Sequence, residues 1–192
     1  NNYNPNNATK YPVMVFFHGG GEAKPITENQ DNLYWGAQKF EQRINEGQWN
    51  GFLIFPQSTR SGWDDTHFFA MNNVIDTLAK YNNVDVDKVV AMGLSIGGLG
   101  AIEYARYHPT RVATLAPSSP ALLTSTVPDM PDFLHIPTFL GFGGTDTNPR
   151  PADVQVYINN FRNLGGDLDT AYFPLLGHAC WNEHWDDKYS NR

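Results

Sequence analysis

The chain has a single cysteine and few lysines, and it contains no long apolar run. One thiol, Cys180, cannot form an internal disulfide, and it excludes zinc sites built from several cysteines. The apolar runs are too short to cross a bilayer, and no basic-then-apolar leader opens the chain. The net charge of −7 disfavours nucleic acid and anionic membranes as partners. We therefore expect a soluble domain that binds neither of them.

Asparagine and aromatic residues are plentiful where lysine is scarce, and this composition favours a secreted or periplasmic location. A length of 192 residues fits one α/β domain with a full core, whereas a second domain is hard to accommodate. Residues 1–10 are polar, rich in asparagine and interrupted by Pro5, which predicts a leading loop or linker. We expect residues 1–192 to form a single domain.

Predicted strands and helices alternate along the chain. Apolar runs of strand length lie at 11–17, 51–56, 89–94, 111–116, 136–142 and 170–173. Helical spacing of apolar residues covers 31–46, 66–81, 99–107 and 151–164, while 121–135 carries two prolines and no clear period and predicts a loop over the sheet. This alternation predicts an α/β fold, a three-layer α/β/α sandwich with a mostly parallel central sheet.

The most informative stretch is Gly-Leu-Ser-Ile-Gly at 93–97, which follows a strand and precedes a helix. In a nucleophile elbow the serine occupies a strained turn, and side chains two positions before and after it would collide with the turn. Glycine at 93 and 97 removes those atoms. The pattern predicts Ser95 as a nucleophile, because glycine-rich turns rarely stand in this strand–turn–helix context by chance.

A serine nucleophile needs a base to take its proton and an acid to orient that base. Asp146 and His178 each follow a predicted strand at its carboxyl end, as Ser95 does. The order serine, acid, histidine is the one expected of α/β hydrolases. We therefore predict that Ser95, Asp146 and His178 form a catalytic triad, although either of the last two residues taken alone is compatible with a structural or surface role.

The negative oxygen of a tetrahedral intermediate needs N–H donors that are already in place. The residue after the nucleophile, Ile96, supplies one, and the glycine-rich loop at 18–21 supplies another. We assign the second donor to Gly20, with Gly21 as the alternative or a third donor. Alone, such a glycine run is equally compatible with a flexible loop.

Two tryptophans are predicted substrate contacts, Trp63 in a loop at the carboxyl end of a strand and Trp181 just after His178. Trp63 is equally compatible with a cap on the core. We expect His18 to hold the glycine loop by hydrogen bonds and Cys180 to be a small packed residue. No metal site is expected, since His178 and the nearby acidic and histidine residues match no standard zinc spacing.

Four motifs together resemble the bacterial esterase and depolymerase branch of the α/β-hydrolase superfamily: His-Gly-Gly-Gly-Glu (18–22), Gly-Leu-Ser-Ile-Gly-Gly (93–98), Gly-Thr-Asp (144–146) and Gly-His-Ala-Cys-Trp (177–181). That branch contains feruloyl and acetyl-xylan esterases of carbohydrate esterase family one and polyhydroxybutyrate-depolymerase-like enzymes. The resemblance implies hydrolysis of carboxylic esters, on carbohydrate or similar alcohols, through an acyl-enzyme and without a cofactor. It also implies that two parts of the usual fold are absent or shortened here, the first antiparallel strands and the final long helix, as in a domain trimmed from a longer protein.

Two other functions stay open at this point. A prolyl-oligopeptidase-like serine peptidase shares the same motifs and the same triad. A catalytically silent hydrolase-like binding module shares the fold, but an intact triad with both oxyanion elements argues against it. For the esterase, the expected partner is a small-molecule or polysaccharide-linked ester.

Overall fold

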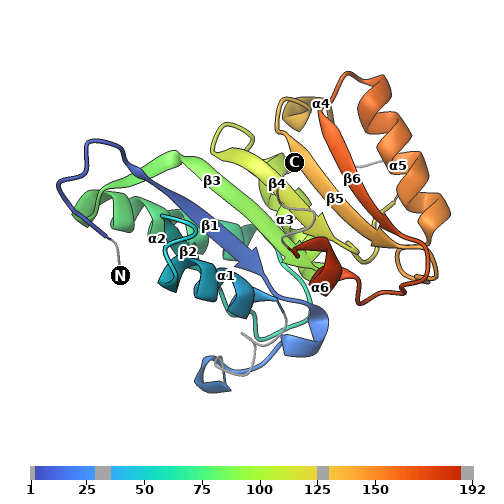
Figure 1. Cartoon of the computed structure of the whole chain (residues 1–192), viewed down its shortest axis with the longest axis horizontal. Helices are drawn as coiled ribbons and strands as arrows, with labels where there is room; N and C mark the ends of the chain where they lie inside the picture. Colours follow the sequence, from blue (N-terminus) through green and yellow to red (C-terminus); the bar gives the residue numbers. More distant parts are fainter. Residues whose placement is uncertain (1–2, 29–35, 125–129, 187–192) are drawn as a thin grey trace.

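The computed structural model describes residues 3–28, 36–124 and 130–186. Six strands form one sheet in the order β2-β1-β3-β4-β5-β6, and each neighbouring pair is parallel (Figure 1). The strands are β1 (Tyr11–Phe17), β2 (Phe52–Ile54), β3 (Val84–Leu94), β4 (Val112–Ser118), β5 (Thr138–Gly143) and β6 (Leu168–Phe173).

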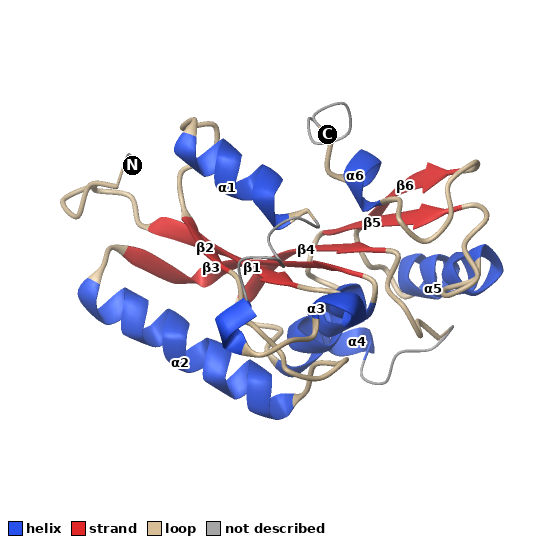
Figure 2. Ribbon diagram, turned by 90° about the horizontal axis from the view of Figure 1, so that it is seen from below, coloured by secondary structure: helices blue, strands red, loops and turns tan. Residues whose placement is uncertain are grey.

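Helices cover both faces of this sheet, which confirms the predicted three-layer sandwich. They are α1 (Ala37–Asn45), α2 (Asp65–Tyr81), α3 (Ile96–Tyr107), α4 (Met130–Phe133), α5 (Pro151–Asn163) and α6 (Trp181–His184), with a short 3-10 turn η1 (Gly20–Glu22). Figure 2 shows α1 and α6 on one face and α2, α3, α4 and α5 on the other. Within the described ranges, none of the helices is both long enough and apolar enough to span a membrane.

The largest differences from the sequence prediction concern three elements, while the ends of most others shift by at most three residues. The strand β3 begins at Val84, earlier than predicted, because Val84 already pairs with Tyr11 of β1. The predicted loop at 121–135 contains the short helix α4, whose apolar residues are buried in the core, while 125–129 lie outside the described residues. The helix predicted over 31–46 is seen as α1 over 37–45. Residues 29–35 also lie outside the described residues.

Alternation along the central strands divides the core between the two faces. Side chains such as Val13 and Val15 of β1 pack into a large cluster with α2, α3, α4 and α5. Met14 and Phe16 point to the other face and join a smaller cluster with α1 and α6. Because parallel strands end at the same edge of a sheet, the loops after β1, β3, β5 and β6 are brought together there.

Candidate active site

Ser95 occupies the sharp turn between β3 and α3. Its φ of 56° and ψ of −126° lie in a region that residues other than glycine rarely adopt. Hydrogen bonds hold the turn on both sides, since Ser95 N–H donates to the Ser118 carbonyl at 3.0 Å and Ala121 N–H donates to the Ser95 carbonyl at 2.9 Å. Strain of this kind persists where the surroundings fix it, and it often marks a functional position.

Gly93 and Gly97 have no room for a side chain, as the sequence predicted for a nucleophile elbow. A Cβ atom on Gly97 would collide with the backbone carbonyls of Phe17 and His18 at the end of β1. A Cβ atom on Gly93 would collide with the Gly97 and Phe17 carbonyls. The atoms that exclude side chains at these two positions therefore belong to the end of the adjacent strand β1 as well as to the turn itself.

The structure brings Ser95, His178 and Asp146 into one hydrogen-bonded chain. The Ser95 Oγ atom lies 2.8 Å from Nε2 of His178, and Nδ1 of His178 lies 2.9 Å from Oδ2 of Asp146. The buried Asp146 carboxylate also accepts the Asn148 N–H at 2.9 Å. Because a carboxylate only accepts, Nδ1 carries the ring proton, and Nε2 is free to accept the serine proton.

Unused N–H groups stand next to the serine at the two predicted oxyanion positions. Ile96 is the first residue of α3 and Gly20 is the first of η1, and neither N–H donates to a backbone carbonyl within the described ranges. The two residues face each other, since a Cβ on Gly20 would lie 3.6 Å from Cγ2 of Ile96. Gly21 is exposed, and a Cβ there would meet nothing within 4 Å. These positions suit two N–H donors to an oxygen bound beside Ser95.

His18 is buried beneath the glycine loop in the structural role predicted for it. Its Nε2 accepts the Ser58 N–H at 3.0 Å, so its Nδ1–H donates to the Gly19 carbonyl at 2.7 Å. Burial lowers the pKa of His18, which keeps the ring neutral in this arrangement. The Gln57 side chain adds a hydrogen bond to the Glu22 carbonyl at 3.0 Å.

The two predicted substrate contacts lie at different depths. The Trp63 ring packs edge-on against Phe17, with centroids 4.9 Å apart, and its Nε1–H donates to the His18 carbonyl at 3.1 Å. These contacts place Trp63 over the core, against the end of β1. Trp181 is almost fully buried and packs edge-on against the His178 ring at 5.5 Å. Contact of either residue with substrate stays a prediction.

Cys180 is fully buried beside the site, and its Sγ atom lies 3.2 Å from Oγ of Ser119. Burial raises the pKa of this thiol, so it stays protonated and packs as a small apolar group. Across residues 3–28, 36–124 and 130–186, no cluster of three histidine, cysteine or acidic side chains is placed to hold a metal ion.

Sequence reasoning missed Asn148 as part of the site. Its N–H donates to Asp146, and its Oδ1 accepts the Leu122 N–H at 2.8 Å, which ties the loop after β4 to the loop that carries the acid. The position two residues after an aspartate is a local signal for the first bond. The bond to Leu122 has no local signal, because it joins residues that are distant in the sequence.

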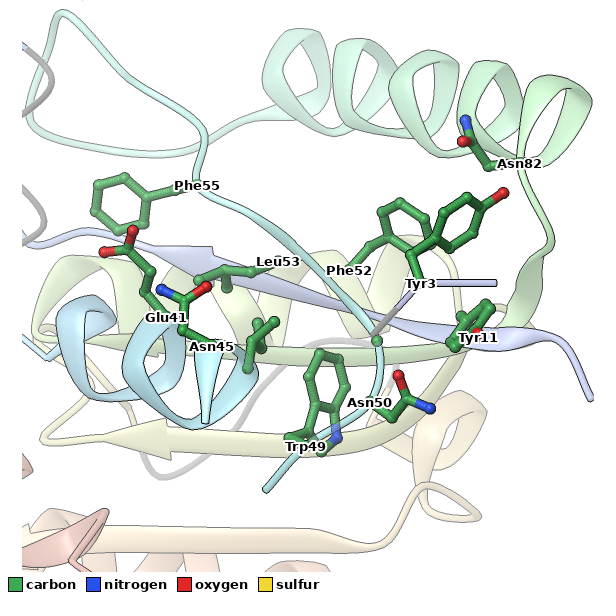
Figure 3. Close-up of a pocket in the computed structure, with 12 residues that line it drawn as sticks. Tyr3, Tyr11, Glu41, Asn45, Trp49, Asn50, Phe52, Leu53, Phe55 and Asn82 are labelled. Carbon is green, nitrogen blue, oxygen red and sulfur yellow. The ribbon is translucent and has the colours of Figure 1, made fainter. Parts of the chain in front are cut away.

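A cavity of about 580 Å³ lies elsewhere, along β2 and α1 (Figure 3). Aromatic rings of Tyr3, Trp49 and Phe52 line it together with polar side chains such as Glu41 and Asn45. None of the predicted site residues lines this cavity. This cavity is therefore separate from the candidate site at Ser95.

The comparisons with known proteins find one matching family model and solved structures that share the fold. The family model described as "Putative esterase" matches residues 1–191. The structure of a thermostable esterase is similar at a TM-score of 0.82 and 21% identity, covering 98% of this chain and 55% of that one, so this chain spans about half of its length. No sequence in the search of curated proteins matches.

Two further solved structures share the fold at low sequence identity. A ferulic acid esterase has a TM-score of 0.68 and 18% identity, covering 95% of this chain and 84% of that one. An acetyl ester-xyloside bifunctional hydrolase from Caldicellulosiruptor lactoaceticus has a TM-score of 0.63 and 14% identity, covering 94% and 79%.

Proposed function

This chain belongs to the esterase family, and we propose that it hydrolyses carboxylic esters through an acyl-enzyme intermediate formed on Ser95. One observation carries the proposal most strongly. Ser95 Oγ, the His178 ring and the Asp146 carboxylate form one chain with distances of 2.8 and 2.9 Å. No other arrangement of a nucleophile, a base and an orienting acid stands beside the unused N–H groups of Ile96 and Gly20 in the described part of the chain.

The geometry supports the following sequence of steps. The Ser95 oxygen attacks the ester carbonyl while Nε2 of His178 takes the hydroxyl proton, and Asp146 stabilises the imidazolium ion that results. The N–H groups of Ile96 and Gly20 bind the oxygen that becomes negative. His178 then returns its proton to the leaving alcohol, and the acyl group remains on Ser95. Water attacks the acyl-enzyme by the same steps in a second half-reaction and releases the acid.

We propose an acyl group esterified to carbohydrate, or to a similar alcohol, as the substrate class, in an exported enzyme. Two similar structures support this class by their names, a ferulic acid esterase and an acetyl ester-xyloside hydrolase. Feruloyl, acetyl and short-chain aliphatic esters, each offered as a methyl ester and as a sugar ester, separate acyl from alcohol preference. Faster turnover of the sugar esters supports the proposal, whereas a preference for a proline amide supports a peptidase instead.

The mechanism is tested with p-nitrophenyl acetate and the variant Ser95→Ala. We expect turnover in the native protein and a loss of at least about 10⁴-fold in kcat in the variant, because the nucleophile is gone. Ser119→Ala is the matched control, since this buried serine bonds Cys180 and has no hydrogen bond to His178. Comparable activity in Ser95→Ala and the control would refute the proposal.

A further inference from the structure

The hydroxyl group of Ser61 stands beside both proposed oxyanion donors. A Cβ atom on Gly20 would lie 2.5 Å from Oγ of Ser61 and 3.6 Å from Cγ2 of Ile96. The hydroxyl group therefore lies against Gly20 on the side that faces Ile96. Because Ser61 belongs to the loop after β2, a further loop of the sheet reaches the proposed oxyanion site.

No contact inside the protein uses this hydroxyl group. The Ser61 side chain is exposed, and its Oγ atom forms no hydrogen bond with another residue in the described ranges. Ser58, earlier in the same loop, is the opposite case. Its buried hydroxyl group donates to the Arg60 or the Gly62 carbonyl, at 2.7 and 3.1 Å, and accepts the Arg60 N–H at 3.2 Å. Ser58 therefore holds the loop together, while Ser61 is available to a bound molecule.

The loop that carries Ser61 is tied to the residue that also holds the glycine loop, His18. Ser58 N–H donates to Nε2 of His18 at 3.0 Å, and Nδ1–H of His18 donates to the Gly19 carbonyl at 2.7 Å. On the other side of Ser61, the Trp63 indole N–H donates to the His18 carbonyl at 3.1 Å. Ser61 lies between two residues that both bond His18, so its position relative to the glycine loop is set before a substrate binds.

A hydroxyl group in this place suits the charge that forms during ester hydrolysis. Its single hydrogen can rotate toward an acceptor. A hydrogen bond to a negatively charged oxygen is roughly twice as strong as one between neutral groups. A donor that is already in place therefore stabilises the tetrahedral intermediate more than the bound ester, and this difference raises kcat.

We propose that Ser61 supplies a third donor of the oxyanion site, and that its Oγ–H binds the same negative oxygen as the N–H groups of Gly20 and Ile96. This inference rests on the proposed function. It also gives a reason for glycine at position 20, because a Cβ atom there would push the Ser61 hydroxyl group aside.

Three variants test this role with p-nitrophenyl acetate. Ser61→Ala removes the hydroxyl group, and we expect kcat to fall about tenfold with KM within about twofold of the native value. The thermal midpoint should not change, because the side chain is exposed and loses no hydrogen bond within the described residues. Ser61→Thr keeps a hydroxyl group and should recover most of the kcat. Thr59→Val is the matched control, since it removes another exposed hydroxyl group from the same loop.

Phenylboronic acid gives a second readout, which reports the negative charge directly. Its boron bonds the Ser95 oxygen while His178 takes the serine proton, and the product is a tetrahedral anion. We expect the inhibition constant to rise in Ser61→Ala by about the same factor as kcat falls. It should change little in Ser61→Thr and in Thr59→Val.

The contact between Ser61 and Gly20 is tested by combining two substitutions. The new Cβ atom of Gly20→Ala would lie 2.5 Å from Oγ of Ser61 but 3.5 Å from its Cβ atom, which is an ordinary contact distance. We therefore expect Gly20→Ala to lower kcat more in the native protein than in the Ser61→Ala background. An equal effect of Gly20→Ala in the two backgrounds would contradict the proposal.

Three other results would overturn it: a kcat within about twofold of native in Ser61→Ala, an equal loss in Ser61→Thr or Thr59→Val, or a change in KM alone. The last result would mean that the hydroxyl group binds the ester and not the charged intermediate. Failure of the proposed function is distinguishable from these results. It shows as native protein without esterase activity, or as activity that survives Ser95→Ala.

Discussion

The two faces of the sheet differ in how thoroughly they are covered. On one face α2, α3, α4 and α5 pack into a large apolar cluster that includes the fully buried rings of Phe133 and Phe161. On the other face α1 and the four-residue helix α6 pack into a smaller cluster around Phe16 and Phe40 (Figure 2). The proposed catalytic residues are likewise carried by elements on different faces of the sheet.

Ser95 stands at the start of α3, which packs on the thickly covered face, whereas His178 leads into α6 on the thin face. Buried nitrogen atoms without hydrogen-bond partners are found on α6 and just after it, at Trp181, His184 and Trp185. The helix is held by aromatic packing and by two hydrogen bonds from α1, in which Lys39 Nζ donates to the Asn182 carbonyl at 2.8 Å and an Arg43 guanidinium N–H donates to the Trp185 carbonyl at 2.9 Å. The difference between the two faces teaches that Ser95 is supported by the large cluster, while the position of His178 depends on the small aromatic cluster.

The largest effect is expected where the two halves of the site meet, at the bond between Asp146 and His178. In Asp146→Asn the amide N–H₂ replaces an acceptor, which favours the wrong ring tautomer, so we expect kcat to fall about 10⁴-fold. The thermal midpoint should change little, because the side chain keeps its size. Steady-state kinetics on p-nitrophenyl acetate check this, with Asp153→Asn in the exposed Arg150 ion pair as the control. A kcat within tenfold of native would contradict the assigned role of the acid.

The next prediction sharpens the comparison of the faces directly. Phe133→Ala empties a site in the large cluster, and we expect it to lower the free energy of unfolding by about 3–5 kcal/mol. Phe40→Ala on the thin face should cost less, near the lower end of that range, because Phe40 is less completely buried and lies in a smaller cluster. Urea unfolding of both variants at one pH measures the difference. Equal losses would show that the two faces are packed equally well.

The smallest effect concerns the acid sensitivity of the thin face. Burial lowers the pKa of His184 from 6.5 to about 3, and its ring packs against Phe139 at 4.6 Å. The unfolded chain therefore binds a proton that the folded chain does not, so stability falls as the pH drops from 6.5 toward 3, by about 1.4 kcal/mol per unit from this group.

His184→Leu removes that proton uptake and keeps an apolar side chain in the site. We expect the free energy of unfolding, measured in urea between pH 6 and pH 5, to fall by about 1 kcal/mol less in the variant than in the native protein. The lowered pKa values of His18 and His67 act in the same direction but are common to both proteins. Identical pH profiles would mean that His184 reaches solvent or a partner.

Much of the sheet and the triad geometry was predictable because local pattern and topology agree. Apolar runs marked all six strands, and the carboxyl ends of parallel strands must share an edge, so residues as distant as Ser95 and His178 were expected to meet. The short helix α4 was not predictable. Its segment has prolines and no apolar period, and only contacts made in the folded core bury Met130 and Phe133.

The side-chain bonds that organise the site were also beyond the sequence. The contacts of Asn148 depend on the exact path of the loops, and no spacing rule connects Leu122 with Asn148. The orientation of Trp63 was left open for a related reason, since an aromatic residue in a loop has no periodic pattern to indicate which side it faces. The thin cover on the α1 and α6 face depends on how two short helices pack, which composition does not show.

The central claim is that His178 activates one serine for attack on a carbonyl. A fluorophosphonate probe tests it most directly, because the probe reacts with an activated serine and the adduct can be located by mass spectrometry. We predict one adduct, on Ser95, in the folded native protein and at least about 100-fold slower labelling in His178→Ala. Folded native protein that stays unlabelled at Ser95, or labelling that is as fast in His178→Ala, would contradict the account.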